Sequence, residues 1–82
     1  MMGKYIVMIE IDLAGEYEKR THTLVEAANT REAEALALKA EAHNELELDK
    51  EARCWRDDWM SYRIGSVTQV TNHEWEMLKV LL

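Results

Sequence analysis

The residue types best suited to chemistry in this sequence are one cysteine and three histidines. The side chains that zinc prefers as ligands are present as His22, His43, Cys54 and His73. They form no C-x-x-C, H-x-x-x-H or H-E-x-x-H unit, so a metal site would need four unrelated segments to converge. The spacing therefore predicts neither a metal site nor a bound cofactor.

Cys54 is also the best candidate for a nucleophile. Arg53 and Arg56 beside it would favour the thiolate, and a histidine from elsewhere in the chain could act as the base. Alternatively, Cys54 is a small apolar residue packed beside Trp55, because unpaired cysteines are among the most often buried residues. The sequence favours the packed cysteine and predicts a protein that is not an enzyme.

Two pairs of carboxylates could in principle supply an acid and a base. Such pairs work when burial drives their two pKa values apart. Asp57 and Asp58 are adjacent and would diverge on a helix, whereas Glu10 and Asp12 share one face of an expected strand. Neither pair shows a sign of burial, so both indicate solvated surface rather than a catalytic site.

The aromatic residues of the C-terminal half are the most informative. A chain without phenylalanine must take large apolar volume from Trp, Tyr, Leu and Met, so a core position is the first interpretation. The alternative is an exposed patch that contacts a partner or lines a ligand pocket, where tryptophan is enriched. The candidate interface or ligand patch consists of Leu48, Trp55, Trp59, Tyr62, Trp75 and Leu82. Asp57 and Asp58 beside it would attract a cationic group of a ligand.

Length and charge narrow the classes of function. At 82 residues the chain predicts a single domain, 1–82, because two independent cores would each be too small. A net charge of −6 disfavours direct binding to nucleic acid. A single cysteine suits a reducing compartment, which predicts a cytoplasmic location. The N-terminal apolar run at residues 5–9 is too short for a membrane span.

The first half of the chain predicts a hairpin followed by a helix. Residues 4–13 alternate as a central strand, a glycine-containing reversal follows at 14–16, and residues 17–28 form a more polar edge strand. Asn29 or Thr30 is placed to cap a helix. The apolar stripe expected on that helix is Ala33, Leu36, Ala37 and Ala40, with Leu38 towards a second side.

The second half predicts more helix and a third strand. Leu48, Ala52, Trp55 and Trp59 fit one helical face, so either a second helix begins near residue 47 or one helix spans 30–58. Residues 60–70 form a strand with a bulge at Gly65-Ser66, and Thr71 with Glu74 forms a capping box for a helix over 72–82. The stripe expected on that last helix is Trp75, Leu78 and Leu82, widened by Met77 and Leu81.

This order of elements predicts an α+β fold, a two-layer ββα(α)βα domain whose three-stranded antiparallel sheet packs against helices. The apolar surface of the expected helices and of the Val80-Leu81-Leu82 end is larger than three strands can cover. This excess favours a homodimer, in which a second copy covers the remaining surface. We therefore expect a small acidic non-catalytic interaction protein, an adaptor or inhibitor. In size and composition it resembles small phage and mobile-element proteins. The alternative is a binder of a small cationic or aromatic molecule that uses the Trp/Tyr patch.

Overall fold

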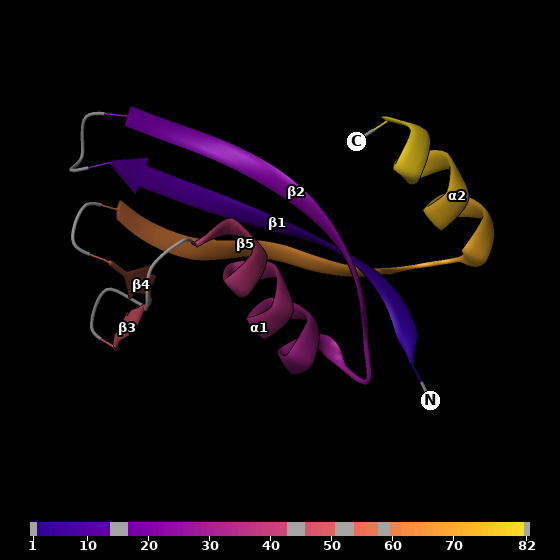
Figure 1. Ribbon diagram of the computed structural model, residues 1–82, viewed down its shortest axis with the longest axis horizontal. Helices are drawn as coiled ribbons and strands as arrows, with labels where there is room; N and C mark the ends of the chain where they lie inside the picture. The colour runs from indigo at the N-terminus through magenta and orange to yellow at the C-terminus, as the bar shows by residue number, and fades with distance from the viewer. Residues whose placement is uncertain (1, 14–16, 43–45, 51–53, 58–59, 82) are drawn as a thin grey trace.

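The computed structural model describes residues 2–13, 17–42, 46–50, 54–57 and 60–81. Within these residues the fold contains five strands and two helices (Figure 1). In chain order they are β1 (Gly3–Leu13), β2 (Tyr17–Ala27), α1 (Thr30–Glu41), β3 (Glu47–Asp49), β4 (Cys54–Arg56), β5 (Met60–Val70) and α2 (Asn72–Leu81). The predicted α+β class is thus confirmed.

All five strands belong to one antiparallel sheet in the order β2-β1-β5-β4-β3. The three long strands match the predicted ones, and β2 lies at an edge as expected. Leu13 faces Tyr17 across the β1–β2 pair, which confirms the hairpin, while its turn at 14–16 lies outside the described residues. The sheet therefore has five strands, and the prediction of three was wrong.

The core lies on one face of β1. Tyr5, Val7, Ile9 and Ile11 are buried there, since alternate side chains of a strand point to the same face. Val7 and Ile9 are completely buried. The predicted alternation of β1 is confirmed up to Ile11, whereas Leu13 at the end of the strand is exposed.

The predicted bulge in β5 is confirmed. Met8 of β1 faces Ser66, but the next residue, Ile9, faces Ile64, so Gly65 is the extra residue. A Cβ atom at Gly65 would lie only 2.7 Å from the Met8 Sδ atom. Glycine at this position therefore lets the Met8 side chain lie across β5.

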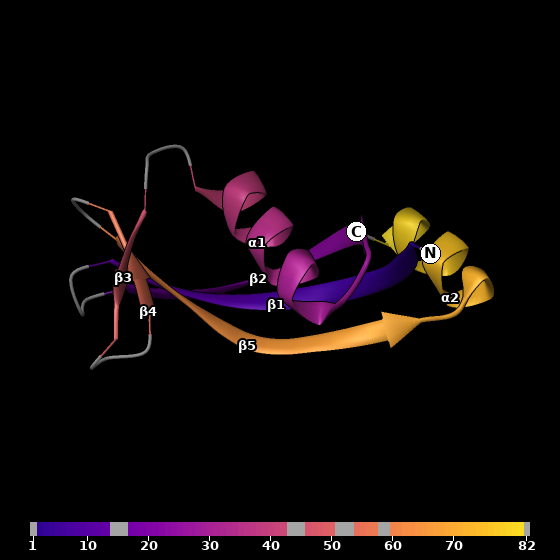
Figure 2. The same ribbon diagram turned by 90° about the horizontal axis from the view of Figure 1, so that it is seen from below.

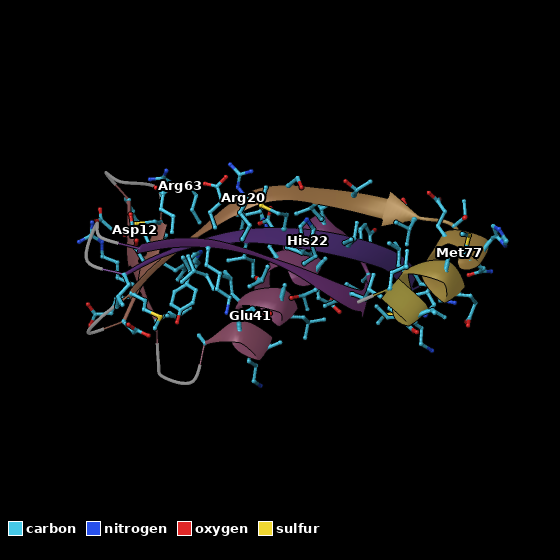
Figure 3. The ribbon with its side chains drawn as sticks, turned by 90° about the horizontal axis from the view of Figure 1, so that it is seen from above. Asp12, Arg20, His22, Glu41, Arg63 and Met77 are labelled. Atoms are coloured by element: carbon cyan, nitrogen blue, oxygen red, sulfur yellow. The ribbon has the colours of Figure 1, made fainter. Side chains whose placement is uncertain are left out.

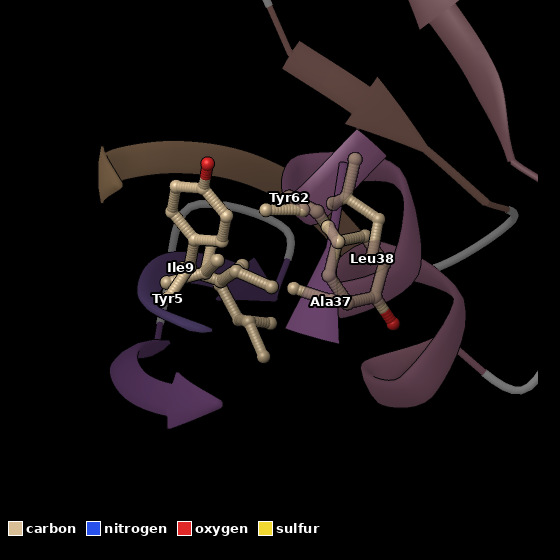
Figure 4. Close-up of a cluster of buried hydrophobic side chains, with 9 residues drawn as sticks. Tyr5, Ile9, Ala37, Leu38 and Tyr62 are labelled. Carbon is tan, nitrogen blue, oxygen red and sulfur yellow. The ribbon is translucent and has the colours of Figure 1, made fainter. Parts of the chain in front are cut away.

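Helix α1 begins as predicted but is rotated about its axis. Asn29 is the cap, and its Oδ1 atom accepts a hydrogen bond of 2.9 Å from the Glu32 N–H. The buried side chains are Ala33, Ala37 and Leu38, whereas Leu36 and Ala40 of the predicted stripe are exposed. The two alanines allow close approach to the sheet, and Leu38 lies beside Tyr62 in the core (Figure 4). Leu38 therefore takes the core position expected for Leu36.

The helix predicted between residues 47 and 58 was wrong, because β3 and β4 form a short hairpin there. Leu48 faces Trp55 across this hairpin, and β4 pairs with β5. Strand β4 pairs with β5 only at Ser61 and Tyr62, so the hairpin covers just the beginning of the second edge of β5. Strand β3, of only three residues, is the last strand on this side of the sheet. Of the predicted helical face, Ala52 and Trp59 lie outside the described residues.

The two helices differ in how they pack on the sheet. Helix α1 packs on one face of β1, β2 and β5, whereas α2 lies beyond the end of the sheet where β1 begins (Figures 1 and 2). No residue of α2 is buried. Among the described residues, no helix combines the length and apolar character needed to cross a bilayer.

Candidate functional site

The predicted aromatic patch is divided between the two ends of the molecule. Leu48 and Trp55 belong to the β3–β4 hairpin, and Tyr62 lies next to them on β5. Trp75 belongs to α2, at the opposite end of the sheet (Figure 1). The remaining candidates, Asp58, Trp59 and Leu82, lie outside the described residues. Of the four members of the patch that the structure describes, three lie together and Trp75 is separate.

Tyr62 is a core residue, only 3% exposed. Its hydroxyl donates a hydrogen bond of 3.3 Å to the Asp57 Oδ2 atom. Burial raises the pKa of Tyr62, and the neighbouring Asp57 carboxylate raises it further. Because the ring is buried and its hydroxyl is bonded to Asp57, Tyr62 is not open to a ligand.

Asp57 closes the turn between β4 and β5. Its Oδ1 atom accepts a hydrogen bond of 2.7 Å from the Met60 N–H, while its own N–H donates to the Met60 carbonyl at 3.0 Å. Both carboxylate oxygens therefore accept hydrogen bonds from within the protein. This arrangement gives Asp57 a structural role and does not support its predicted role in attracting a ligand cation.

Cys54 is buried and free, but it is not part of the hydrophobic core cluster against which Trp55 packs. Cys54 lines a hollow of about 90 Å³ whose border includes Glu10, Arg20 and Arg63. Arg20 and Arg63 lie on the sheet face away from α1 (Figure 3). Glu10 faces both arginines across the neighbouring strands. The border of the hollow thus carries opposite charges that face one another.

No histidine of the described residues joins Cys54. His22 is on β2, separated from β4 by two strands, and His73 is on α2 at the far end of the sheet. Arg53 and His43 lie outside the described residues. The pKa of Arg56 is raised by a hydrogen bond with Cys54 and by the charge of Asp49. The Asp49 Oδ2 atom lies 3.4 Å from the Arg56 Nε atom. Nor does any group of three or more His, Cys, Asp or Glu in the described segments suit a metal ion.

Helix α2 carries the clearest exposed apolar surface. Met77 is 55% exposed, Val80 85% and Leu81 75%. Residues at spacings of three and four lie on the same side of a helix, so these side chains form one continuous surface. We call Met77, Val80 and Leu81 the α2 strip.

The opposite side of α2 is attached to the beginning of β1. The Lys4 Nζ atom donates a hydrogen bond of 3.0 Å to the Asn72 Oδ1 atom. It also lies 5.6 Å from the centre of the Trp75 ring, a cation–π contact. Trp75 and Leu78 are half-buried, while the α2 strip remains exposed.

A second apolar group adjoins this attachment. Ile6 and Met8 follow Lys4 on the β1 face away from the core, and Leu24 of β2 faces Ile6. All three are half-buried. We call Ile6, Met8 and Leu24 the open-face cluster. The sequence shows Ile6 and Met8 on this face, but nothing local places Leu24 beside them.

The capping box at the start of α2 is confirmed. The Thr71 N–H donates to the Glu74 Oε1 atom at 2.9 Å, and the Glu74 N–H donates to the Thr71 Oγ1 atom at 3.1 Å. These hydrogen bonds hold the pKa of Glu74 below its ordinary value, and the bond from the Thr71 backbone N–H has the largest effect. The carboxylate form of Glu74 is therefore the form that stabilises α2.

We expect α2 to lose helical content in acid. Because the folded-state pKa of Glu74 is depressed, its contribution is complete above the ordinary glutamate pKa of about 4.3 and is lost as the pH falls through the folded value. Circular dichroism and amide exchange of α2 between neutral and acid pH measure this loss. In the Glu74→Gln variant the amide can still accept the Thr71 hydrogen bond but does not titrate. An acid transition of α2 that is the same in both proteins would contradict this role of Glu74.

In comparisons with known proteins, no family model matched the chain, and neither did a curated protein or a solved structure.

Proposed function

We propose that this chain is a non-catalytic interaction protein that binds a polypeptide through the α2 strip. The observation that carries the proposal is the exposure of Met77, Val80 and Leu81 together on a helix with no buried residue. Adjacent exposed apolar side chains of this size mark contact surfaces. Spacings of three and four are those by which an amphipathic helix enters an apolar groove of its partner.

The placement of the other candidates supports this surface over the small-molecule alternative. Tyr62 is packed in the core, and Asp57 accepts hydrogen bonds from Met60 and Tyr62. A ligand that bound to Tyr62 and Asp57 would have to displace both of these contacts. The α2 strip, in contrast, can be covered without breaking a described hydrogen bond.

The proposal assigns an adaptor or inhibitor role in the cytoplasm. A net charge of −6 keeps the free chain soluble and attracts partners with basic borders around their binding surface. A single buried cysteine suits a reducing compartment. An origin in a phage or mobile element is part of the same proposal and rests on size and composition alone.

Photo-crosslinking tests the proposal. We replace Val80 with the photoreactive residue p-benzoylphenylalanine, irradiate cells of the native host and detect covalent adducts of the chain with any polypeptide. Leu48 is the matched control position, because it is 49% exposed and lies at the other end of the sheet. We expect at least tenfold more adduct from position 80 than from position 48. Equal yields, or none at position 80, would contradict the proposed function.

A further inference from the structure

We propose that an extended segment of another polypeptide binds along the free side of β5 and adds one strand to the sheet. The binding surface is the backbone of residues 66–70, which we call the β5 edge. This surface is separate from the α2 strip, so the inference goes beyond the proposed function. The segment that fits it alternates apolar with uncharged polar residues and carries no acidic residue.

The backbone of the β5 edge is paired on one side only. Residues 66–70 pair with β1 from Met8 to Lys4, whereas β4 reaches only Ser61 and Tyr62 on the other side of β5. Among the described residues, none bonds through its backbone to this other side of 66–70. Figure 2 shows the second half of β5 along the lower border of the molecule, with no helix below it. Its unpaired N–H and C=O groups are therefore a template for one more strand.

The residue types of the β5 edge do not protect it from pairing. Natural sheets protect their edges with charged side chains, above all lysine, and with proline. Strand β2 at the opposite edge follows this rule, since it carries Lys19, Arg20 and two glutamates. Residues 66–70 carry no charge and no proline, and their three β-branched side chains favour a strand. The bulge at Gly65 lies before these residues and does not interrupt them.

The side chains along the β5 edge indicate which segment fits. Val67 faces Val7 and packs against the hydrophobic core, while Ser66 and Thr68 are exposed on the opposite face. Adjacent strands pair their side chains on the same face, so an apolar residue would lie beside Val67 and hydroxyl-bearing residues beside Ser66 and Thr68. The net charge of −6 repels acidic segments, and it also disfavours a second copy of this chain as the partner.

Amide hydrogen exchange of the full chain, followed by NMR, tests this binding. The probe is a capped peptide with the core Val-Thr-Val-Thr-Val between two lysines, which matches the β5 edge in length. In the free chain, the amides of 66–70 should alternate between slow and fast exchange, because alternate N–H groups point to β1 and to solvent. At about 2 mM peptide and a dissociation constant of about 1 mM, the fast amides should exchange about threefold more slowly.

Two controls accompany the probe. A peptide with proline in place of both threonines keeps the charge but loses two N–H groups and cannot pair as a regular strand, so it should give no protection. Thr68→Lys places on the β5 edge the kind of charge that protects other edges, and it should weaken binding of the probe at least threefold. His22→Lys makes the same change at an exposed position of β2 and should leave binding unchanged. Both positions are exposed, so both variants should keep the far-UV circular dichroism spectrum.

Selective slowing at 66–70 by the Val-Thr probe supports the inference. Slow exchange of every amide of 66–70 in the free chain would mean that the edge is already covered, and would overturn it. The same holds if the probe slows none of these amides, if the proline peptide slows them equally, or if His22→Lys weakens binding as much as Thr68→Lys. Protection that rises with the concentration of the chain alone would identify a second copy as the partner and would overturn the choice of another polypeptide.

Discussion

The Tyr62→Ala variant is expected to unfold with a free energy about 3–5 kcal/mol lower than that of the unchanged protein. Tyr62 is 3% exposed, so truncation removes a large buried ring and leaves a cavity beside Leu38. A domain of 82 residues has a stability of roughly 4–12 kcal/mol, so this loss is a large fraction of the total. Urea denaturation followed by circular dichroism measures it.

Tyr62→Phe is the matched control for the ring. It keeps the buried ring and removes only the hydroxyl that donates to Asp57, which should cost about 0.5–1.5 kcal/mol. If Tyr62 instead lined an open ligand pocket, truncation to alanine would leave stability nearly unchanged. A loss of less than about 1 kcal/mol for Tyr62→Ala would therefore contradict the core assignment.

The second large effect is expected from Ile9→Ala on β1. Ile9 is completely buried and is one of the two largest such side chains in the core. Removing three of its carbon atoms should lower the free energy of unfolding by about 2–5 kcal/mol, whereas Ile9→Val should cost about 0.5–1.5 kcal/mol. Urea denaturation of both variants gives these values.

Leu48→Ala supplies the surface control for Ile9→Ala. Because Leu48 is half exposed, its truncation should change stability by less than about 0.5 kcal/mol. Similar losses for Ile9→Ala and Leu48→Ala would mean that β1 does not carry the core on the face described above.

Local signals account for the elements that were predicted correctly. The alternation in β1, the glycine of the β5 bulge and the caps at Asn29 and Thr71 depend on residues close together in the sequence. Such features are decided by side-chain period and by local hydrogen bonds. These signals predicted the three long strands, the start of α1 and both ends of α2 to within about two residues, the usual error at element ends, but they left the end of α1 open.

The segment from Leu48 to Trp55 shows where local signals fail. These two residues are seven apart, which is close to two turns of a helix, but they are also the facing pair of the β3–β4 hairpin. Strands of three residues are too short to show a period of two. What decides the structure is the pairing of β4 with β5, and the sequence gives no local sign of this contact.

The candidate site also combines features that local sequence predicts with features that depend on distant contacts. The apolar residues of α2 could be identified from their helical spacing, and the Val80-Leu81 end was expected to be exposed. The attachment to Lys4 could not be predicted, since Lys4 and Asn72 are 68 residues apart in the chain. This contact fixes which side of α2 faces the sheet and therefore which side chains form the α2 strip.

The central claim is that a polypeptide covers the α2 strip, and the crosslinking yield at Val80 relative to Leu48 measures this most directly. Both side chains are exposed in the single copy, so a free surface would give similar low yields at the two positions. We predict at least ten times more polypeptide adduct at Val80 in cells. A ratio near one would contradict the account.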